Sequence, residues 1–294
     1  MTPAREGTRR VSPGGRVAIV TGASRGIGRA VAQRLASSGV CVVVAARTVT
    51  SGGRLEGSIR EVEQSIRDLG GTALAVACDV ADPSACAELV TAAREAYGPI
   101  DILVNNAALT VPDRRSKPEA GSRSSPSEAL SIVNFPLDEY RRAFEVNLFS
   151  AYRLVQLVAP DMIRRGRGHI VNISSDAAQS PGDGPYPQTP GLPLHGYATS
   201  KAALEHLTRT VAYELTRHHV SVNAVLPSSP IATPGAVFAS RGQIGKSLPM
   251  ARFVDAVEIL CAVSSDECTG TVVHSEDLLD PTGRRRGWLG DAYL

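Results

Sequence analysis

Short apolar runs alternate along this chain with segments whose apolar residues recur every three or four positions. Runs at 16–21, 40–45, 73–78, 100–105, 169–174, 220–226 and 270–274 are typical of buried strands. Helical spacing covers 26–38, 57–69, 83–97, 135–163 and 197–218. Strands that alternate with helices pair in parallel through right-handed crossovers. The pattern therefore predicts an α/β fold with a doubly wound parallel sheet.

Two stretches interrupt this alternation. Residues 112–127 are rich in Pro, Ser and Arg, and residues 181–193 are rich in Pro and Gly, so both are predicted to be loops. Both follow strands, at the edge where an open α/β sheet binds ligands. The first loop is equally compatible with a simple surface insertion. The second lies between Ser175 and Tyr197, which favours a place near a functional site.

Composition excludes several classes of protein. The 294 residues contain 31 Lys and Arg against 29 Asp and Glu, and only 4% are aromatic, so neither charge nor stacking favours nucleic acid. No apolar run approaches the roughly 18 residues of a membrane span, and the N-terminus lacks the apolar region of a secretion signal. The five cysteines form no Cys-x-x-Cys pair, and no His or Cys spacing suggests a metal site. We expect a cytoplasmic protein without a bound metal.

Three glycines cluster between the first predicted strand and the first helix. The segment runs Thr21-Gly22-Ala23-Ser24-Arg25-Gly26-Ile27-Gly28. A turn in this place can bring backbone N–H groups and a helix N-terminus against a pyrophosphate, and glycine leaves room for that approach. The spacing is Gly-x-x-x-Gly-x-Gly instead of the commoner Gly-x-Gly-x-x-Gly. The segment predicts a nucleotide-binding turn in a Rossmann-type sheet.

Further motifs follow the glycine turn in a fixed order, and together they resemble the short-chain dehydrogenase/reductase family. They are Cys78-Asp79-Val80, Asn105-Asn106-Ala107, Asn147, Ser174-Ser175 and Tyr197-x-x-x-Lys201. The resemblance runs from about residue 15 to 270. It implies a single-domain oxidoreductase that transfers hydride between NADP(H) or NAD(H) and a carbonyl or secondary alcohol, assembled as a homotetramer or homodimer. The lengths of segments 47–69 and 227–233 are similar to a hydroxysteroid-dehydrogenase-like subgroup.

The residues after the second predicted strand favour NADP(H). A carboxylate there would bind the ribose hydroxyls of NAD, but this chain has Ala46 and Arg47, with Arg25 in the glycine turn. Two guanidinium groups favour a 2′-phosphate. By the resemblance, the remaining cofactor contacts are Gly22, Ser24, Gly26, Ile27 and Gly28 at the phosphates, Asp79 and Val80 at the adenine, Asn105 at the adenosine through its backbone, and Ile231 and Thr233 at the carboxamide and phosphates. Ser228 replaces the family's usual glycine just before these last two.

Tyr197 and Lys201 stand four residues apart on a predicted helix, so they share one face. A free phenol has a pKa of about 10, and we expect the nearby ammonium, together with the positive nicotinamide of the oxidised cofactor, to lower it enough for Tyr197 to exchange a proton with the substrate oxygen. Ser175 would hydrogen-bond that oxygen; Ser174 is the rival, and the resemblance selects the second serine of the pair. The resemblance also implies that Lys201 binds the nicotinamide ribose and that Asn147 holds a water molecule beside the lysine.

Two other activities are compatible with these motifs. The same fold could carry out epimerisation or dehydration with retained cofactor, or it could be a nucleotide-sensing protein without catalysis. The four filled positions, Ser175, Tyr197, Lys201 and Asn147, argue against the sensor. The substrate, whether steroid, polyketide, acyl thioester or small ketone, stays open. We expect a disordered arm over 1–15, a catalytic domain over 16–280 and a tail over 281–294.

Overall fold

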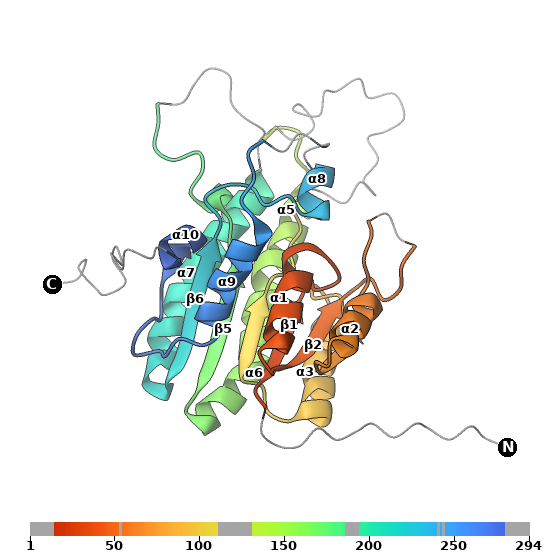
Figure 1. Cartoon of the computed structure of the whole chain (residues 1–294). Helices are drawn as coiled ribbons and strands as arrows, with labels where there is room; N and C mark the ends of the chain where they lie inside the picture. The colour runs from red at the N-terminus through yellow and green to blue at the C-terminus, as the bar shows by residue number, and fades with distance from the viewer. Residues whose placement is uncertain are drawn as a thin grey trace.

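The computed structural model describes residues 15–52, 55–110, 131–185, 194–239, 242 and 245–279. A seven-stranded, wholly parallel sheet runs through its centre in the order β3-β2-β1-β4-β5-β6-β7 (Figure 1). The strands are β1 (Val17–Thr21), β2 (Cys41–Ala46), β3 (Ala73–Ala77), β4 (Ile102–Asn105), β5 (Gly168–Ile173), β6 (Val220–Leu226) and β7 (Val272–His274). The predicted doubly wound fold is confirmed.

Helices cover both faces of the sheet. They are α1 (Gly26–Ser37), α2 (Ile59–Asp68), α3 (Pro83–Tyr97), α5 (Leu137–Phe144), α6 (Ser150–Arg165), α7 (His195–Leu215), α8 (Pro234–Ala239), α9 (Met250–Leu260) and α10 (Ser275–Leu278). Helices α1, α2 and α9 pack on one face, and α3, α6 and α7 pack on the other. A hydrophobic core lies on each face of the sheet, and successive strand residues point to opposite faces: Ala18 and Val20 pack in the first core, and Val17 and Ile19 in the second. Burial on both faces explains why the strands are continuously apolar.

Local signals fix where several helices begin and end. Ser58 and Glu61 form a reciprocal capping box at the start of α2, and the Asp82 side chain caps α3 one residue before Pro83. Gly166 ends α6 in the left-handed conformation. These signals are readable in the sequence, and the predicted boundaries of α1, α2 and α3 lie within two residues of the observed ones.

The long helical region predicted for 135–163 is interrupted in the structure. Helix α5 passes into a π-helical turn, η1 (Glu145–Phe149), before α6 begins. The hydrophobic pattern does not reveal the extra residue of a π turn, because the apolar spacing on either side stays helical. Two further short helical turns, η2 (Asp176–Ala178) and η3 (Thr216–His218), flank α7. Helices α8 and α9 were not predicted, although Phe253, Val254, Val257 and Leu260 have helical spacing.

Some predictions fall on parts of the chain that the structure does not describe. These are the arm apart from Gly15, the tail 281–294, the loop 112–127, and all of the loop 181–193 beyond residue 185. Within the described residues, every helix is too short or too polar to cross a membrane. Cys41 and Cys78 are buried; burial raises the pKa of Cys41, and a hydrogen bond with Cys86 followed by burial raises that of Cys78.

Candidate active site

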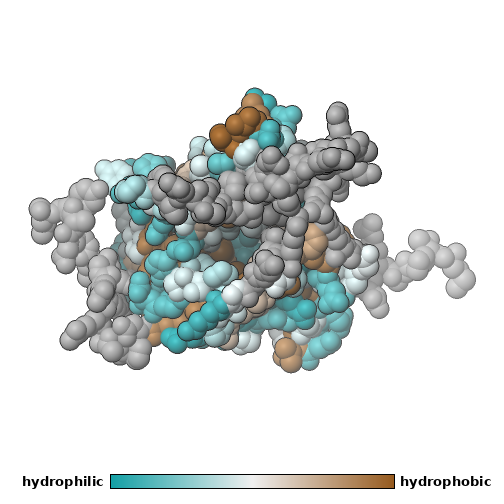
Figure 2. Space-filling model, turned by 90° about the horizontal axis from the view of Figure 1, so that it is seen from above, coloured by the Kyte–Doolittle hydropathy of each residue, from teal (hydrophilic) through white to brown (hydrophobic). Residues whose placement is uncertain are grey.

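An open cleft of about 860 Å³ lies over the carboxyl ends of the strands, and both the glycine turn and the start of α7 line it. Seen from above, the described surface at this end is largely hydrophilic with smaller hydrophobic areas (Figure 2). The cleft brings together most of the predicted site residues: Gly22, Ser24, Arg25, Gly26, Ile27, Arg47, Asp79, Val80, Ser175, Tyr197, Lys201, Ile231 and Thr233. Gly28, Asn105 and Asn147 do not line it.

The glycine turn is held against the loop after β4 by one side chain. Asn106 Nδ2 donates to the carbonyl oxygens of Thr21 and Gly22 at 2.8 and 3.2 Å, and Asn106 N donates to Thr21 Oγ1 at 3.0 Å. A Cβ on Gly28 would come within 2.4 Å of Asn106 Nδ2, and one on Gly22 within 2.8 Å of the Ala107 Cα. The packing of the turn itself therefore requires glycine at these two positions, before any bound molecule is considered.

Helix α1 begins at this turn with its N-terminus directed at the cleft. Arg25 is the N-cap residue, and its side chain makes no capping hydrogen bond. Gly26, with φ of 57°, lies under Thr233, whose Cβ would be 3.2 Å from an added Cβ. An uncapped helix N-terminus offers backbone N–H groups and a positive dipole end to an anion. The turn thus fits a pyrophosphate.

Two arginines lie at the end of the cleft near β2. Arg25 donates to the carbonyl oxygens of Leu55, Glu56 and Gly57 at 2.9 to 3.2 Å, so within the described residues neutral groups hold it and no carboxylate pairs with it. Arg47 is mostly exposed, and its Nη1 lies 4.0 Å from Asp79 Oδ2. Burial, and then the charge of Arg47, lower the pKa of Arg25. An anion bound beside both guanidiniums would relieve this repulsion.

The residues predicted to contact the adenosine lie partly at the cleft surface and partly below it. Asp79 and Val80 line the cleft, and Asp79 Oδ1 accepts a hydrogen bond from Ala81 N at 3.1 Å. Asn105 lies beneath the cleft floor, where its Nδ2 donates to Asn172 Oδ1 at 2.9 Å, and Asn172 Nδ2 donates to Thr208 Oγ1 at 2.9 Å. This buried chain ties β4 to β5 and α7. Any cofactor contact of Asn105 is thus left to its backbone, as the resemblance implied.

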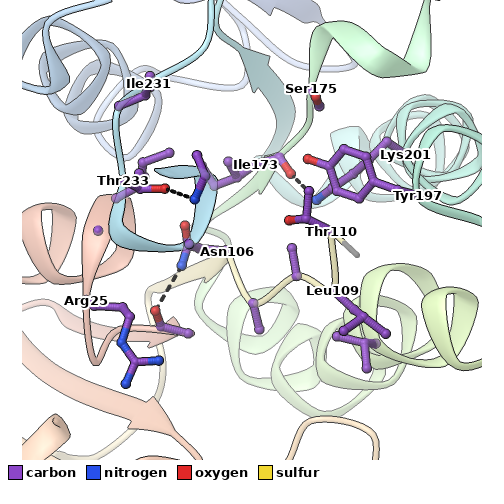
Figure 3. A pocket seen from close by; sticks show the side chains of 18 of the residues that line it. Arg25, Asn106, Leu109, Thr110, Ile173, Ser175, Tyr197, Lys201, Ile231 and Thr233 are labelled. Carbon is purple, nitrogen blue, oxygen red and sulfur yellow. Dashed lines mark hydrogen bonds between the residues drawn. The ribbon is translucent and has the colours of Figure 1, made fainter. Parts of the chain in front are cut away.

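Tyr197 and Lys201 lie together at the opposite end of the cleft from Arg25 (Figure 3). Lys201 is 2% exposed; its Nζ donates to the carbonyl oxygen of Ile173 at 2.6 Å and lies 5.9 Å from the centre of the Tyr197 ring. Burial lowers the pKa of Lys201 to about 8, and the charge of Glu205 opposes this fall.

The phenol of Tyr197 is shifted away from ionisation. Burial raises its pKa, and the hydrogen bond with Ser175 acts in the opposite direction. The predicted lowering of this pKa needs both the lysine and the oxidised nicotinamide; from the chain alone, the Lys201 ammonium is directed at the Ile173 carbonyl, and removal of the phenol from water dominates. The chain alone therefore keeps the proton on Tyr197, which suits a proton donor.

The structure distinguishes the two serines that follow β5. Ser174 is 4% exposed, and its hydroxyl donates to Glu205 Oε1 at 2.6 Å. Both serines line the cleft, and Ser175 Oγ accepts a hydrogen bond from Ala177 N at 3.3 Å and lies near enough to the Tyr197 phenol to lower its pKa. Because the Ser174 hydroxyl is engaged by Glu205, Ser175 is the better placed of the two to meet a molecule bound beside Tyr197, and its role stays a prediction.

Asn147 lies in the π turn η1, behind the cleft. Its Oδ1 accepts from Leu109 N at 2.7 Å, and its Nδ2 donates to Ser200 Oγ at 2.9 Å and to the carbonyl oxygen of Leu109 at 3.2 Å. The amide therefore anchors the loop after β4 to α7. The predicted water contact beside Lys201 stays a prediction: Oδ1 accepts one hydrogen bond here and has a second lone pair.

Ile231 and Thr233 lie on the segment that follows β6. Ile231 is buried, and Thr233 accepts a hydrogen bond from Ala236 N at 3.1 Å at the start of α8. Figure 3 shows both across the cleft from Tyr197, on the side of the glycine turn. Ser228, which replaces the family's usual glycine, hydrogen-bonds Glu276 of α10.

Sequence reasoning missed two polar groups that organise the site. Asn106 was noted as part of a motif, but its contact with the glycine turn spans 84 or more residues and has no local signal. Glu205 was not singled out, although its position four residues after Lys201 places both on one face of α7. Among the described residues, no three His, Cys, Asp or Glu side chains converge on a place that could hold a metal ion.

Comparison with known proteins identifies the family of the chain. The profile of the short chain dehydrogenase family matches residues 16–239. The 7alpha-hydroxysteroid dehydrogenase of Escherichia coli K12 is 34% identical over 215 residues, which cover 73% of this chain and 71% of that enzyme.

Two solved structures extend the comparison. A 7 alpha-hydroxysteroid dehydrogenase complexed with NADH and 7-oxo glycochenodeoxycholic acid superposes with a TM-score of 0.66 at 29% identity, covering 92% of this chain and 96% of that one. A variant of actinorhodin polyketide ketoreductase with NADPH gives 0.72 at 25% identity, covering 88% and 95%. These findings confirm the resemblance noted in the motifs, including that to hydroxysteroid dehydrogenases. The chain belongs to the short-chain dehydrogenase/reductase family of oxidoreductases, whose members act on alcohol and carbonyl groups.

Proposed function

We propose that this protein is an NADP(H)-dependent oxidoreductase that interconverts a carbonyl and a secondary alcohol, with Tyr197, Ser175 and Lys201 at the reacting end of its cleft. The observation that carries the proposal is the placement of Ser175, Tyr197 and Lys201 in one cleft with the glycine turn. The nicotinamide, when bound, supplies or accepts the hydride. The glycines packed under Asn106 and the uncapped start of α1 would hold its pyrophosphate.

The side chains at the reacting end divide the proton chemistry between them. Tyr197, kept protonated by burial, donates its proton to the carbonyl oxygen in reduction and takes it back in oxidation. Ser175 hydrogen-bonds the same oxygen and stabilises the charge that develops there. Lys201 places a positive charge behind the phenol and is available to the nicotinamide ribose. A general acid contributes about 10²- to 10⁴-fold to a rate.

The preference for NADP(H) over NAD(H) rests on the other end of the cleft. Arg25 and Arg47 line it, and Ala46 stands where a carboxylate would repel a phosphate. Within the described residues, Arg25 donates to the Thr48 hydroxyl and to the carbonyl oxygens of Leu55, Glu56 and Gly57, none of which is an acidic group. A 2′-phosphate would supply the missing counter-charge. We expect a lower KM for NADPH than for NADH; equal values, or a lower value for NADH, would contradict this assignment.

Assembly and compartment belong to the same proposal. Phe149 and Tyr152 are 47% and 48% exposed beside Asn147, and Tyr213 of α7 is 88% exposed, so these helices offer apolar surface to a second copy. A homodimer or homotetramer built on α5, α6 and α7 is expected, and light scattering of the purified protein tests it. All five cysteines are free thiols, which favours a reducing compartment such as the cytoplasm.

The test is consumption of reduced nicotinamide with a panel of steroid, polyketide, thioester and small ketones, followed by absorbance. Turnover with at least one ketone, and its product identified as the alcohol, is the expected result. Cofactor binding without turnover on any member would favour the nucleotide-sensing alternative. Conversion of an alcohol-bearing substrate with no net change in absorbance would favour epimerisation or dehydration through a transient oxidised intermediate.

A further inference from the structure

Helix α7 carries another ionisable side chain one turn beyond Lys201. Glu205 follows Lys201 by four residues, as Lys201 follows Tyr197, so the three side chains share one face of the helix. Glu205 is 7% exposed, and none of the chemistry proposed above uses it. Burying a carboxylate is costly unless it is hydrogen-bonded or paired with a charge, so its partners show what it does.

The first partner of Glu205 is the serine that precedes Ser175. Ser174 Oγ donates to Glu205 Oε1 at 2.6 Å, and Ser174 N donates to the carbonyl oxygen of Val225 at 2.8 Å. Ser174 is thus fixed on one side by α7 and on the other by β6. Because Ser175 is the next residue, these two bonds set the direction in which it enters the cleft.

Lys201, one turn before Glu205 on the same face of α7, is the cation on which this carboxylate acts through its charge. Burial lowers the pKa of Lys201 to about 8, and Glu205 is the charged group, among the described residues, that opposes this fall. The Lys201 ammonium otherwise has the Ile173 carbonyl and, at 5.9 Å, the Tyr197 ring. A neutral carbonyl compensates a buried ammonium less well than a carboxylate does.

Positive charge near Glu205 comes from its own helix and from β7. Burial, the largest effect, raises the pKa of its carboxyl, and the Ser174 hydrogen bond, Arg209, His274 and Lys201 act in the opposite direction. Arg209 lies one turn further along α7, and His274 ends β7. The hydrogen bond and these positive or protonatable groups favour the ionised form of the carboxyl.

We propose that Glu205 is a positioning residue that keeps Lys201 charged near neutral pH and, through Ser174, aims Ser175 into the cleft. Its importance for turnover rests on the proposed function. Its effect on the charge of Lys201 does not, and that effect is measurable in the protein without any substrate.

The sequence makes this measurement direct, because the chain has only three lysines, Lys117, Lys201 and Lys246. Protein labelled with ¹³C at the lysine Cε gives three side-chain signals, and the one lost in Lys201→Arg belongs to Lys201. In the wild-type protein this signal is expected to titrate with a midpoint at about 8.

Glu205→Gln removes the charge and keeps the shape and the acceptor for Ser174. The Lys201 midpoint is expected to fall by about one pH unit, as for loss of a nearby opposite charge. Glu214→Gln removes the same charge from an exposed position on the same helix and should leave the midpoint unchanged. A Lys201 midpoint equal in wild type, Glu205→Gln and Glu214→Gln would overturn the proposal.

A second variant tests the proposal even if Glu205→Gln does not fold. Ser174→Ala keeps the carboxylate but removes the hydrogen bond that helps to ionise it, so the Lys201 midpoint should move in the same direction by less. A midpoint in Ser174→Ala that stays at the wild-type value or rises would contradict the proposal on its own.

Turnover provides the last arm of the test. In ketone reduction, the loss of activity on the alkaline side should begin at lower pH in Glu205→Gln than in wild type, by the same interval as the NMR midpoint. If no ketone is turned over by the wild-type protein, the proposed function fails and the NMR titration still decides the role of Glu205. If turnover is normal and the alkaline limbs coincide, Glu205 does not act on the reaction.

Discussion

The two ends of the cleft hold positive charge under opposite conditions. At one end the Arg47 side chain is 58% exposed, and its nearest carboxylate oxygen is 4.0 Å away. At the other end Lys201 is 2% exposed and donates to a backbone carbonyl at 2.6 Å. Charge in water is screened by salt, whereas buried charge is maintained only by specific neighbours. The exposed end is suited to choosing a cofactor, and the buried end to moving a proton.

The largest effect is expected from removing the proton donor at the buried end of the cleft. Tyr197→Phe should lower kcat for ketone reduction by about 10²- to 10⁴-fold, because the phenol is the group that protonates the carbonyl oxygen. The dissociation constant for NADPH, measured by fluorescence titration, should change little. Turnover within tenfold of wild type would show that another group is the acid.

The two serines after β5 offer a sharper comparison within the same end. Ser175→Ala should reduce kcat by about 10²-fold, as expected for one hydrogen bond to a developing oxyanion. Ser174→Ala, which affects the reaction only through Glu205 and the direction of Ser175, should have a smaller effect. Steady-state kinetics of both variants check this order, and the reverse order would exchange their roles.

At the exposed end the expected effect is smaller and specific to the cofactor. Arg47→Ala should raise the KM for NADPH about tenfold, equivalent to 1.4 kcal/mol, and leave the KM for NADH unchanged. Arg60→Ala removes an exposed arginine of α2 that does not line the cleft, and it serves as the matched control. An equal rise for both cofactors would point to lost packing instead of a lost phosphate contact.

The smallest effect is expected from salt. Raising ionic strength roughly tenfold, from about 0.05 to 0.5 M, should raise the KM for NADPH about threefold, because the Arg47 charge is in water. The pH dependence of kcat should barely respond, because Lys201 is buried. If salt changed the KM for NADPH and the pH dependence of kcat to the same extent, the contrast between the two ends of the cleft would be contradicted.

The sequence predicted those parts of the site that depend on local spacing. The glycine turn and the pair Tyr197 and Lys201 each lie within eight residues, and helix geometry or turn sterics determine their arrangement. The strands were equally clear, because burial on both faces leaves them apolar throughout.

Other parts of the site depend on contacts between distant segments. The bond from Asn106 to the glycine turn joins β4 to β1, and that from Ser174 to Glu205 joins β5 to α7. The rise in the pKa of Tyr197 could not be read from the sequence, because burial and the direction of the Lys201 ammonium are properties of the packed structure. The resemblance to a family selected Ser175, but only its surroundings give a physical reason for the choice.

The Asn106 contact has a consequence for affinity. Its amide holds the backbone of the glycine turn in shape from within the protein, by bonds that involve no bound molecule. A dinucleotide that enters the cleft therefore meets a rigid cradle and spends none of its binding energy on ordering a loop. Association should then be fast, with a heat-capacity change that reflects buried surface alone and no contribution from coupled folding.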